Sequence, residues 1–394
     1  MSDLFEVESR YTSGVYAKRH VTIVRGEGAV LWDDQGREYI DCVGGQGTAN
    51  LGHANAAVAA AIAAQAHKLI SCPEIFPNDQ RAALMERLTQ LTGMPRVFLC
   101  NSGTEAVEAA IKFARAYASR AEIVAAMRGF HGRTFGALSA TWNKAYREPF
   151  EPLVPGYSHV PYNNLDAMSK AVTDKTAAVI LEVVQGEGGV YPGSAEYLCG
   201  AQQLCRERGA LLIVDEVQTG FGRTGKMFAM QHYGLQPDLL CLAKSIAGGV
   251  PMGATLIGER LGVLPGHIHG STFGGNPLAC AASLAALAEM ERLDLPARAA
   301  ENGAYFKERL QDAARNSPLI REVRGLGLLV GVELKKKSAP YIAALMGHGV
   351  MALSAGMNVI RFLPPLVITR EQLGRVTDTL AQVLAEPPAE AAAE

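Results

Sequence analysis

The sequence lacks the features that mark a membrane, secreted or nucleic-acid-binding protein. None of its apolar runs reaches the roughly 20 residues needed to span a bilayer. Residues 1–6 show no basic segment followed by an apolar stretch, which a secretory signal requires. Lysines and arginines number 37 against 39 aspartates and glutamates, so no global field favours nucleic acid or an anionic membrane. We therefore expect a cytoplasmic protein with neither a membrane nor a nucleic-acid partner.

Disulfide and metal patterns are also missing. The seven cysteines form no CxxC pair, and most lie in apolar runs such as Val97–Cys100, which is typical of small buried side chains in a reducing compartment. They are Cys42, Cys72, Cys100, Cys199, Cys205, Cys241 and Cys280. His267 and His269 stand two residues apart without further ligands at zinc spacing. We therefore expect no metal site.

From about residue 55 to residue 280, short apolar segments alternate with helical ones. Helices are predicted over 56–68, 80–92 and 106–118, and strands over 97–100, 122–127, 177–184, 210–215 and 239–243. Continuously apolar strands that alternate with helices predict an α/β fold, a mostly parallel sheet covered by helices on both faces.

The two ends of the chain are expected to form a second domain, because 394 residues exceed one ordinary core. A hairpin is predicted over residues 29–41, and an α+β unit over residues 320–362 between helices. We predict a large domain over residues 50–280 and a smaller α+β domain from residues 1–49 together with 281–385. Residues 386–394, rich in proline, alanine and glutamate, are predicted to form a flexible tail.

Polar groups directly follow four of the predicted strands. They are Asn101–Thr104, Gly129–His131, Gln185–Glu187 and Asp215–Glu216. Ligands of such sheets bind at the carboxyl ends of the strands, so these groups are expected to converge on one edge.

Lys244 follows the apolar strand 239–243. A lysine at the end of a buried strand is partly desolvated, which lowers its pKa and makes the neutral amine available to condense with an aldehyde. The alternative is an ordinary lysine whose amine reaches solvent.

Asp215 ends the strand 210–215, 29 residues before Lys244 (244 − 215). Pyridoxal phosphate accepts electrons only while its ring nitrogen is protonated, and a neighbouring carboxylate keeps it so. The alternative, a metal-binding carboxylate of a nucleotide enzyme, is weakened because no GxxxxGKS or GxxxxGKT loop precedes it.

Ser102, Gly103 and Thr104 follow a strand and open an alanine-rich helix. Such a helix N-terminus attracts an anion such as a phosphate. Ser102 is also a suitable N-cap with Glu105 at the capping-box position, and the two roles are compatible. Phe130, at another strand end, either stacks on a cofactor ring or packs in the core.

Arg133 and Arg361 are arginines in glycine-rich or apolar surroundings, and either one suits a substrate carboxylate. Arg361 lies within the apolar segment Val359–Phe362, where a charge needs a partner or a ligand.

Together these motifs resemble the class III aminotransferases, pyridoxal-phosphate enzymes of fold type I, over the chain up to about residue 385. The motifs that carry the resemblance occur in family order: Asn101–Ala106, Val184–Gly189, Asp215–Gly220, Leu242–Ser245 and Gly270–Pro277. Within the class the chain is most similar to the acetylornithine aminotransferases and the LysW-aminoadipate semialdehyde transaminases of a carrier-protein lysine pathway. Residues 40–45, 49–53 and 146–150 favour the latter.

The resemblance implies a role for each motif residue. For pyridoxal 5'-phosphate it implies Lys244 as its covalent attachment and the catalytic base, Ser102, Gly103 and Thr104 at the phosphate, Thr272 at the partner subunit's phosphate, Phe130 on the ring, Asp215 at the ring nitrogen and Gln218 at the ring hydroxyl. For the substrates it implies Arg133 and Ser271 at the donor carboxylate, and Glu187 paired with Arg361 until 2-oxoglutarate binds.

The expected reaction therefore moves the terminal amino group of LysW-bound lysine to 2-oxoglutarate, within a homodimer. Acetylornithine is the alternative donor. A glutamate-semialdehyde aminomutase, or a nucleotide-binding α/β protein without activity, stays open at this level. Lys18, Arg19 and Lys335–Lys337 are candidate contacts for an acidic LysW-type carrier protein.

Overall fold

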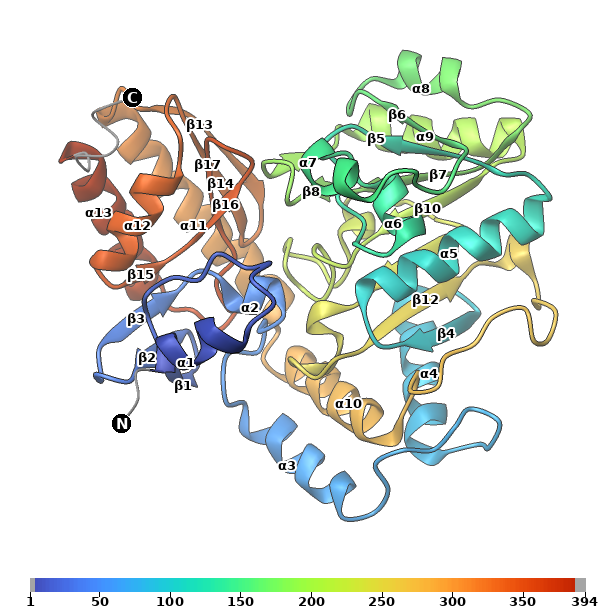
Figure 1. Cartoon of the computed structure of the whole chain (residues 1–394), viewed down its shortest axis with the longest axis horizontal. Helices are drawn as coiled ribbons and strands as arrows, with labels where there is room; N and C mark the ends of the chain where they lie inside the picture. The colour runs from blue at the N-terminus through green and yellow to red at the C-terminus, as the bar shows by residue number, and fades with distance from the viewer. Residues whose placement is uncertain (1–3, 387–394) are drawn as a thin grey trace.

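A seven-stranded sheet forms the centre of the larger half of the computed structural model, which describes residues 4–386 (Figure 1). In sheet order its strands are β4 (Arg96–Cys100), β12 (Gly253–Ile257), β11 (Leu239–Leu242), β10 (Leu211–Asp215), β7 (Thr176–Glu182), β5 (Glu122–Ala126) and β6 (Tyr157–Val160). Strands β11, β10, β7, β5 and β6 run parallel, whereas β12 is antiparallel to both of its neighbours. The predicted α/β fold with a mostly parallel sheet is confirmed.

Helices cover both faces of this sheet. Successive side chains of β10 point alternately to the two faces and contact different helices. Leu211 and Ile213 join the apolar cluster that contains the buried side of α5 (Gly103–Ala118). Leu212 and Val214 point to the opposite face, in the cluster that contains α9 (Ala195–Arg208). Because both faces are covered, every residue of β10 is buried, which explains its unbroken apolar sequence.

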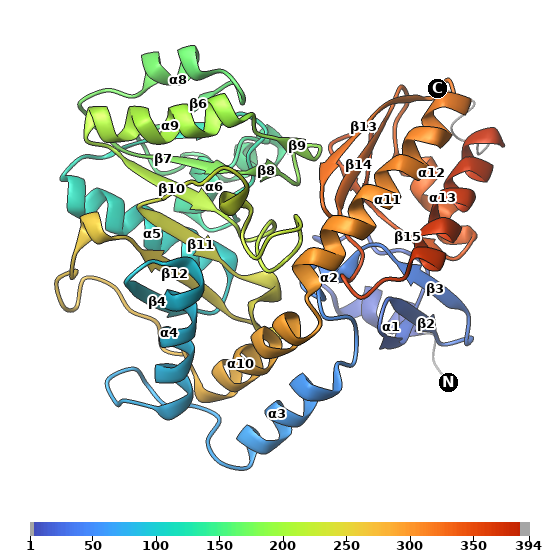
Figure 2. The same ribbon diagram turned by 180° about the vertical axis from the view of Figure 1, so that it is seen from behind.

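The smaller half of the molecule is built from the N-terminal and C-terminal parts of the chain (Figures 1 and 2). One sheet consists of β1 (Ile23–Glu27), β2 (Val30–Asp33), β3 (Glu38–Asp41) and β15 (Val350–Met351), and a second of β13 (Ile320–Leu326), β14 (Leu329–Leu334), β17 (Val359–Phe362) and β16 (Leu353–Ala355). Its helices are α11 (Leu295–Asn316), α12 (Ala339–Gly347) and α13 (Arg370–Ala385). In Figure 2, α11 runs along the face of the second sheet.

Three helices lie beneath the large sheet in Figure 1, where α10 (Pro277–Arg292) packs on α3 (Ala56–Ala66) and α4 (Asp79–Thr92). The remaining elements are short: α1 (Leu4–Tyr11), α2 (Gly44–Gly47), α6 (Phe135–Ala140), α7 (Lys144–Arg147), α8 (Leu165–Ala171), β8 (Val184–Gln185), β9 (Tyr191–Pro192) and four 3₁₀ turns at 148–150, 229–232, 244–247 and 259–261. The domain boundaries at residues 50 and 280 stay a prediction, and residues 387–394 of the predicted tail lie outside the described residues.

The sequence-based strands differ from the sheet in two respects. Strands β6 and β12 were not among them: β6 is an edge strand with partly exposed residues, and β12 stands between glycine- and proline-containing loops. The predicted strand 177–184 ends instead at Glu182, and β8 begins after Val183 to pair with β9.

All seven cysteines are unpaired, and five of them are buried, but Cys199 is exposed and Cys72 is half-buried. Within residues 4–386 no helix combines the length and the hydrophobicity that crossing a bilayer demands.

Candidate active site

A cavity of about 410 Å³ lies beside the carboxyl ends of the parallel strands. Nine of the residues singled out in the sequence line it: Ser102, Gly103, Thr104, Phe130, Arg133, Glu187, Asp215, Gln218 and Lys244. Arg361 contacts the wall of the cavity from β17, whereas Ser271 and Thr272 do not line it.

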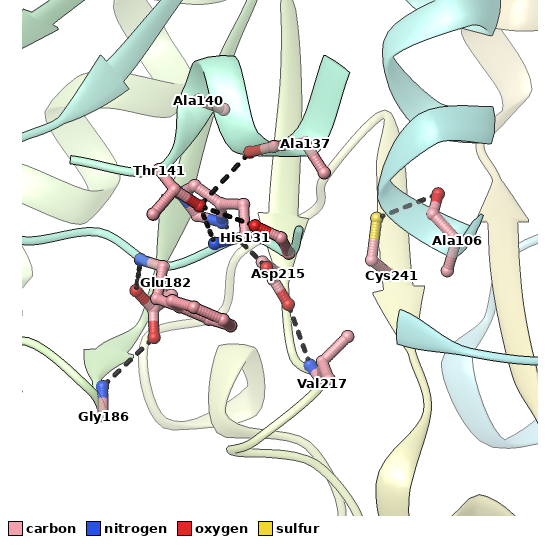
Figure 3. Close-up of polar contacts among 12 residues, drawn as sticks. Ala106, His131, Ala137, Ala140, Thr141, Glu182, Gly186, Asp215, Val217 and Cys241 are labelled. Carbon is pink, nitrogen blue, oxygen red and sulfur yellow. Dashed lines mark hydrogen bonds and ion pairs between the residues drawn. The ribbon is translucent and has the colours of Figure 1, made fainter. Parts of the chain in front are cut away.

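Asp215 ends β10 with its carboxylate held from two sides (Figure 3). His131 Nδ1 lies 2.8 Å from Oδ2, and the backbone N–H of Val217 donates to Oδ1 across 3.0 Å. His131 is fully buried, and burial alone lowers the pKa of an imidazole. Its bond to Asp215 and the charge of that carboxylate outweigh burial and raise the pKa of His131. The Asp215 carboxylate is therefore held in a fixed position at the cavity wall.

Lys244 begins the turn after β11, with its backbone in the left-handed region at φ +50°. Among residues 4–386, no carboxylate lies within ion-pair distance of its Nζ. Burial lowers the pKa of the Lys244 amine, and the more distant Glu187 carboxylate opposes this shift. The neutral amine is therefore more accessible than in an ordinary lysine.

The N-terminus of α5 faces the same cavity. Ser102 caps the helix by accepting from the N–H of Glu105 (3.3 Å), and the Glu105 carboxylate accepts from Ser102 Oγ (2.8 Å). The N–H groups of Gly103 and Thr104 have no protein acceptor within the described chain. A Cβ at position 103 would stand 2.7 Å from Val217, so only glycine fits this close approach. Two amides at a helix N-terminus form an anion site.

Phe130 and Arg133 form one side of the cavity with Tyr146 behind them. The Phe130 and Tyr146 rings meet edge to face, with centroids 6.1 Å apart. The Arg133 guanidinium lies 3.7 Å from the centre of the Tyr146 ring and 5.6 Å from that of Phe130. Arg133 is exposed and has no ion pair among the residues described, so its charge is open to an anionic ligand.

Arg361 and Glu187 bring the smaller half of the molecule against the cavity. Arg361 Nη1 lies 2.7 Å from Glu187 Oε1 and donates to Gln218 Oε1 across 3.1 Å. Burial raises the pKa of Glu187, but the Arg361 charge outweighs this and holds the pKa below its ordinary value. Arg361 Nε is buried and has no hydrogen-bond partner among residues 4–386. Gln218, expected only at a cofactor hydroxyl, thus also supports this arginine.

Ser271 and Thr272 occupy a loop outside the cavity of their own chain. Ser271 Oγ accepts from Asn101 Nδ2 (3.1 Å), which ties this loop to the segment before α5. Thr272 is exposed, and so is Phe273 beside it.

Two residues of the site were given no individual chemical role in the sequence-based interpretation, although His131 was expected at this edge of the sheet. His131 stands next to Phe130, but its contact with Asp215 joins positions 84 residues apart. Glu182 ends β7, lines the cavity and is 5% exposed. Its position directly after the apolar run 177–181 is a signal that the sequence does carry.

The arrangement fits pyridoxal phosphate. The unpaired amides of Gly103 and Thr104 suit its phosphate, and the fixed Asp215 carboxylate suits a protonated ring nitrogen. Lys244, at the same cavity with a lowered pKa, suits its aldehyde.

Comparison with known proteins places these features in context. A family model described as aminotransferase class-III matches residues 12–384. A LysW-aminoadipate semialdehyde transaminase from Deinococcus radiodurans is 53% identical over 383 residues, covering 96% of this chain and 89% of that protein. An acetylornithine aminotransferase from Methanothermobacter thermautotrophicus is 44% identical over 386 residues, covering 98% and 99%. The ornithine aminotransferase structure from Toxoplasma gondii ME49 has a TM-score of 0.94 at 35% identity, covering 97% of this chain and 94% of that one.

Proposed function

Because this chain belongs to the class III aminotransferases, which are pyridoxal phosphate enzymes, we propose that it moves the terminal amino group of LysW-bound lysine to 2-oxoglutarate. The interpretation as a nucleotide-binding protein without activity is overturned by the family match over residues 12–384. The observation that carries the acceptor half of the proposal is the buried Arg361, whose one carboxylate partner within the described chain is Glu187.

The cofactor would be held by the residues that face the cavity. Gly103 and Thr104 would take the phosphate through their free amides, Phe130 would cover the ring, and Asp215 would face the ring nitrogen. When bound, pyridoxal phosphate supplies an electron sink for the carbon that loses its proton.

Lys244 would hold the cofactor and move the proton. Its lowered pKa provides a neutral amine that can accept a proton from the substrate carbon, as a general base must. Its partly buried position limits access of water to that proton. His131 keeps the Asp215 carboxylate oriented while the proton moves.

Arg361 would bind one carboxylate of 2-oxoglutarate after Glu187 moves aside. A buried guanidinium without a counter-ion is costly, so Glu187 neutralises it whenever no diacid is present. Arg133, exposed and without an ion pair in the described chain, would take the other carboxylate. This use of an external diacid distinguishes the proposal from a glutamate-semialdehyde aminomutase.

The amino donor is inferred from similarity and from the surroundings of the cavity. Identity to the LysW-aminoadipate semialdehyde transaminase is 53%, against 44% for the acetylornithine aminotransferase. Acetylornithine is kept as a second donor, since several relatives between 41% and 46% identical carry that name.

A carrier-bound donor needs an open approach to Lys244. A second cavity of about 600 Å³ shares Phe130 and Glu187 with the first and carries the exposed cations Arg128 and Lys144. Lys18 is engaged with Glu8 (2.7 Å), and Arg19 donates to the Ala352 carbonyl, which makes them weaker contacts for an acidic carrier. We place the carrier at this second cavity.

A homodimer is part of the proposal. Thr272 is exposed and does not line the cavity of its own chain, so it would reach the phosphate of the partner subunit.

The test compares kcat/KM for LysW-bound lysine and for N-acetylornithine with 2-oxoglutarate as acceptor. The proposal expects the carrier-bound donor to be preferred by at least about tenfold, equivalent to about 1.4 kcal/mol. A preference for N-acetylornithine would assign the enzyme to that donor. Amino transfer that proceeds without 2-oxoglutarate would overturn the acceptor assignment.

A further inference from the structure

The carboxylate of Glu182 lies at the contact between two loops of the site. The Phe130 loop, residues 127–131, follows β5, and the Glu187 loop, residues 185–188, follows β7 and begins in β8. The N–H of Phe130 donates to Glu182 Oε1 across 3.0 Å, and the N–H of Gly186 donates to Oε2 across 3.1 Å. Figure 3 shows Glu182 with its carboxylate directed at these contacts. One side chain therefore holds the backbone of both loops.

Two further contacts show that the two loops pack directly against each other. Gln185 Nε2 donates to the Met127 carbonyl across 2.8 Å. A Cβ at Gly188 would stand 2.3 Å from the Arg128 carbonyl oxygen, so the two backbones approach as closely as glycine allows. A displacement of one loop therefore displaces the other.

We propose that Glu182 is a positioning residue that, as a carboxylate anion, holds Phe130 over the cofactor ring and Glu187 against Arg361 in one fixed relationship. The proposal rests on the proposed roles of Phe130 and Glu187, but not on the identity of the amino donor. Glu182 acts through the two loops rather than on the reacting atoms.

The ionised form is required by the hydrogen bonds. Both carboxyl oxygens accept hydrogen bonds from backbone N–H groups. A proton on either oxygen would place an O–H donor opposite an N–H donor. Burial raises the pKa of Glu182 to about 7. The charged neighbours are His131, which opposes the shift, Asp215, which adds to it, and Lys244 across the cavity.

Glu216 offers a matched control. It too is a buried carboxylate at the end of a strand, its pKa is raised by burial to about 7, and it accepts two backbone N–H groups, from Ala229 and Met230. It does not line the cavity. Substitution of Glu216 therefore measures what the loss of such a carboxylate does to the fold alone.

The experiment measures the affinity of the apoenzyme for pyridoxal phosphate by equilibrium dialysis, the visible circular dichroism of the bound cofactor, and the single-turnover rate with glutamate. In Glu182→Gln the amide nitrogen faces a backbone donor, so we expect at least about tenfold weaker cofactor binding and loss of the visible dichroism. In Glu216→Gln we expect less than about a twofold change in affinity and an unchanged dichroism, with any effect confined to the unfolding temperature.

The pH dependence separates positioning from general damage. The ratio of dissociation constants between Glu182→Gln and the unsubstituted enzyme should be largest above pH 7 and approach one as Glu182 itself becomes protonated below about pH 7. A ratio that does not vary with pH, or equal losses in Glu182→Gln and Glu216→Gln, would overturn the proposal.

A second variant covers the possibility of misfolding, monitored by far-ultraviolet circular dichroism. Glu182→Asp keeps the charge, but its side chain is one methylene shorter and reaches only one of the two loops. Its affinity for the cofactor should therefore fall between that of Glu182→Gln and that of the unsubstituted enzyme. Unchanged affinity in Glu182→Asp would overturn the proposal even if Glu182→Gln does not fold. Because glutamate and the cofactor are the only ligands, an error in the assigned amino donor cannot produce these outcomes.

Discussion

Arg361 and Glu187 form an ion pair in which only one member is deeply buried. Their side chains are 2% and 30% exposed, and the guanidinium nitrogen lies 2.7 Å from the carboxylate oxygen. Glu187 lies in a loop with glycines on both sides, whereas Arg361 lies within β17. The carboxylate is therefore the member that can move, and the arginine is the fixed receptor.

This asymmetry predicts that Arg361→Ala impairs the two half-reactions unequally. Because a diacid would lose two charge-assisted hydrogen bonds, kcat/KM for 2-oxoglutarate should fall by about a hundredfold or more. The amino-donor half-reaction should fall by less than about tenfold, since the donor does not need this receptor. Single-turnover absorbance measures both. Arg260→Ala, which removes the surface partner of Asp238, serves as the control, and equal damage to both half-reactions in Arg361→Ala would contradict the prediction.

Replacement of Lys244 by alanine should abolish both the covalent hold on the cofactor and the proton transfer. We expect turnover to fall by at least about 10³-fold, since a general base alone contributes about 10²–10⁴. The visible absorbance of the covalently held cofactor should disappear at neutral pH. Lys170→Ala, on the exposed side of α8, should change neither property. Retention of full activity in Lys244→Ala would refute the assignment.

The charge of Glu187 should set the pH at which Lys244 becomes reactive. Burial lowers the pKa of Lys244, and Glu187 raises it, so Glu187→Gln removes the opposing effect and lowers the pKa further. The rate at which the apoenzyme takes up pyridoxal phosphate should rise with pH up to the pKa of the amine. The bend in that profile should therefore move to lower pH in Glu187→Gln.

A carboxylate outside the cavity provides the comparison for this profile. Glu333 pairs with Arg324 and Arg321, away from Lys244. Glu333→Gln should leave the bend where it is. A bend that stays in place or moves to higher pH in Glu187→Gln would contradict the prediction, because both the lost Glu187 charge and the unpaired Arg361 charge lower the pKa of Lys244.

The proposed role of Thr272 in the partner subunit's site predicts that two inactive variants complement each other in a heterodimer. If Thr272 serves the partner's cavity, a heterodimer of Lys244→Ala and Thr272→Ala chains contains one site with both native residues. Co-expression of the two chains with different tags, followed by double affinity purification, should give about half of the activity per dimer of the unsubstituted enzyme. Activity no higher than that of the separate variants would place Thr272 in its own subunit's site or in none.

The sequence was sufficient for the parts of the site that local chemistry determines. Asp215 ends one apolar strand and Lys244 closely follows another, and parallel strands bring their carboxyl ends to one edge of the sheet. Ser102 and Glu105 form an N-terminal helix cap within four residues of sequence. Such features depend on a few neighbours along the chain, so they are visible without the fold.

His131 and Glu182 were not assigned because their roles depend on contacts between distant segments. A histidine after a phenylalanine has no distinguishing pattern until Asp215, 84 positions later, lies beside it. Glu182 becomes informative only when the amides of Phe130 and Gly186 both point at it. Strand β12 was missed because it stands between glycine- and proline-containing loops, and its antiparallel pairing with β4 joins residues more than 150 positions apart.

The backbone of Lys244, at φ +50°, carries a further consequence. A non-glycine residue in this conformation costs roughly 1–2 kcal/mol, and glycine would relieve that cost. Selection for thermal stability alone would therefore replace the lysine with glycine. The position marks a trade-off between durability and activity, and a descendant that had lost its enzymatic purpose would be expected to change there early.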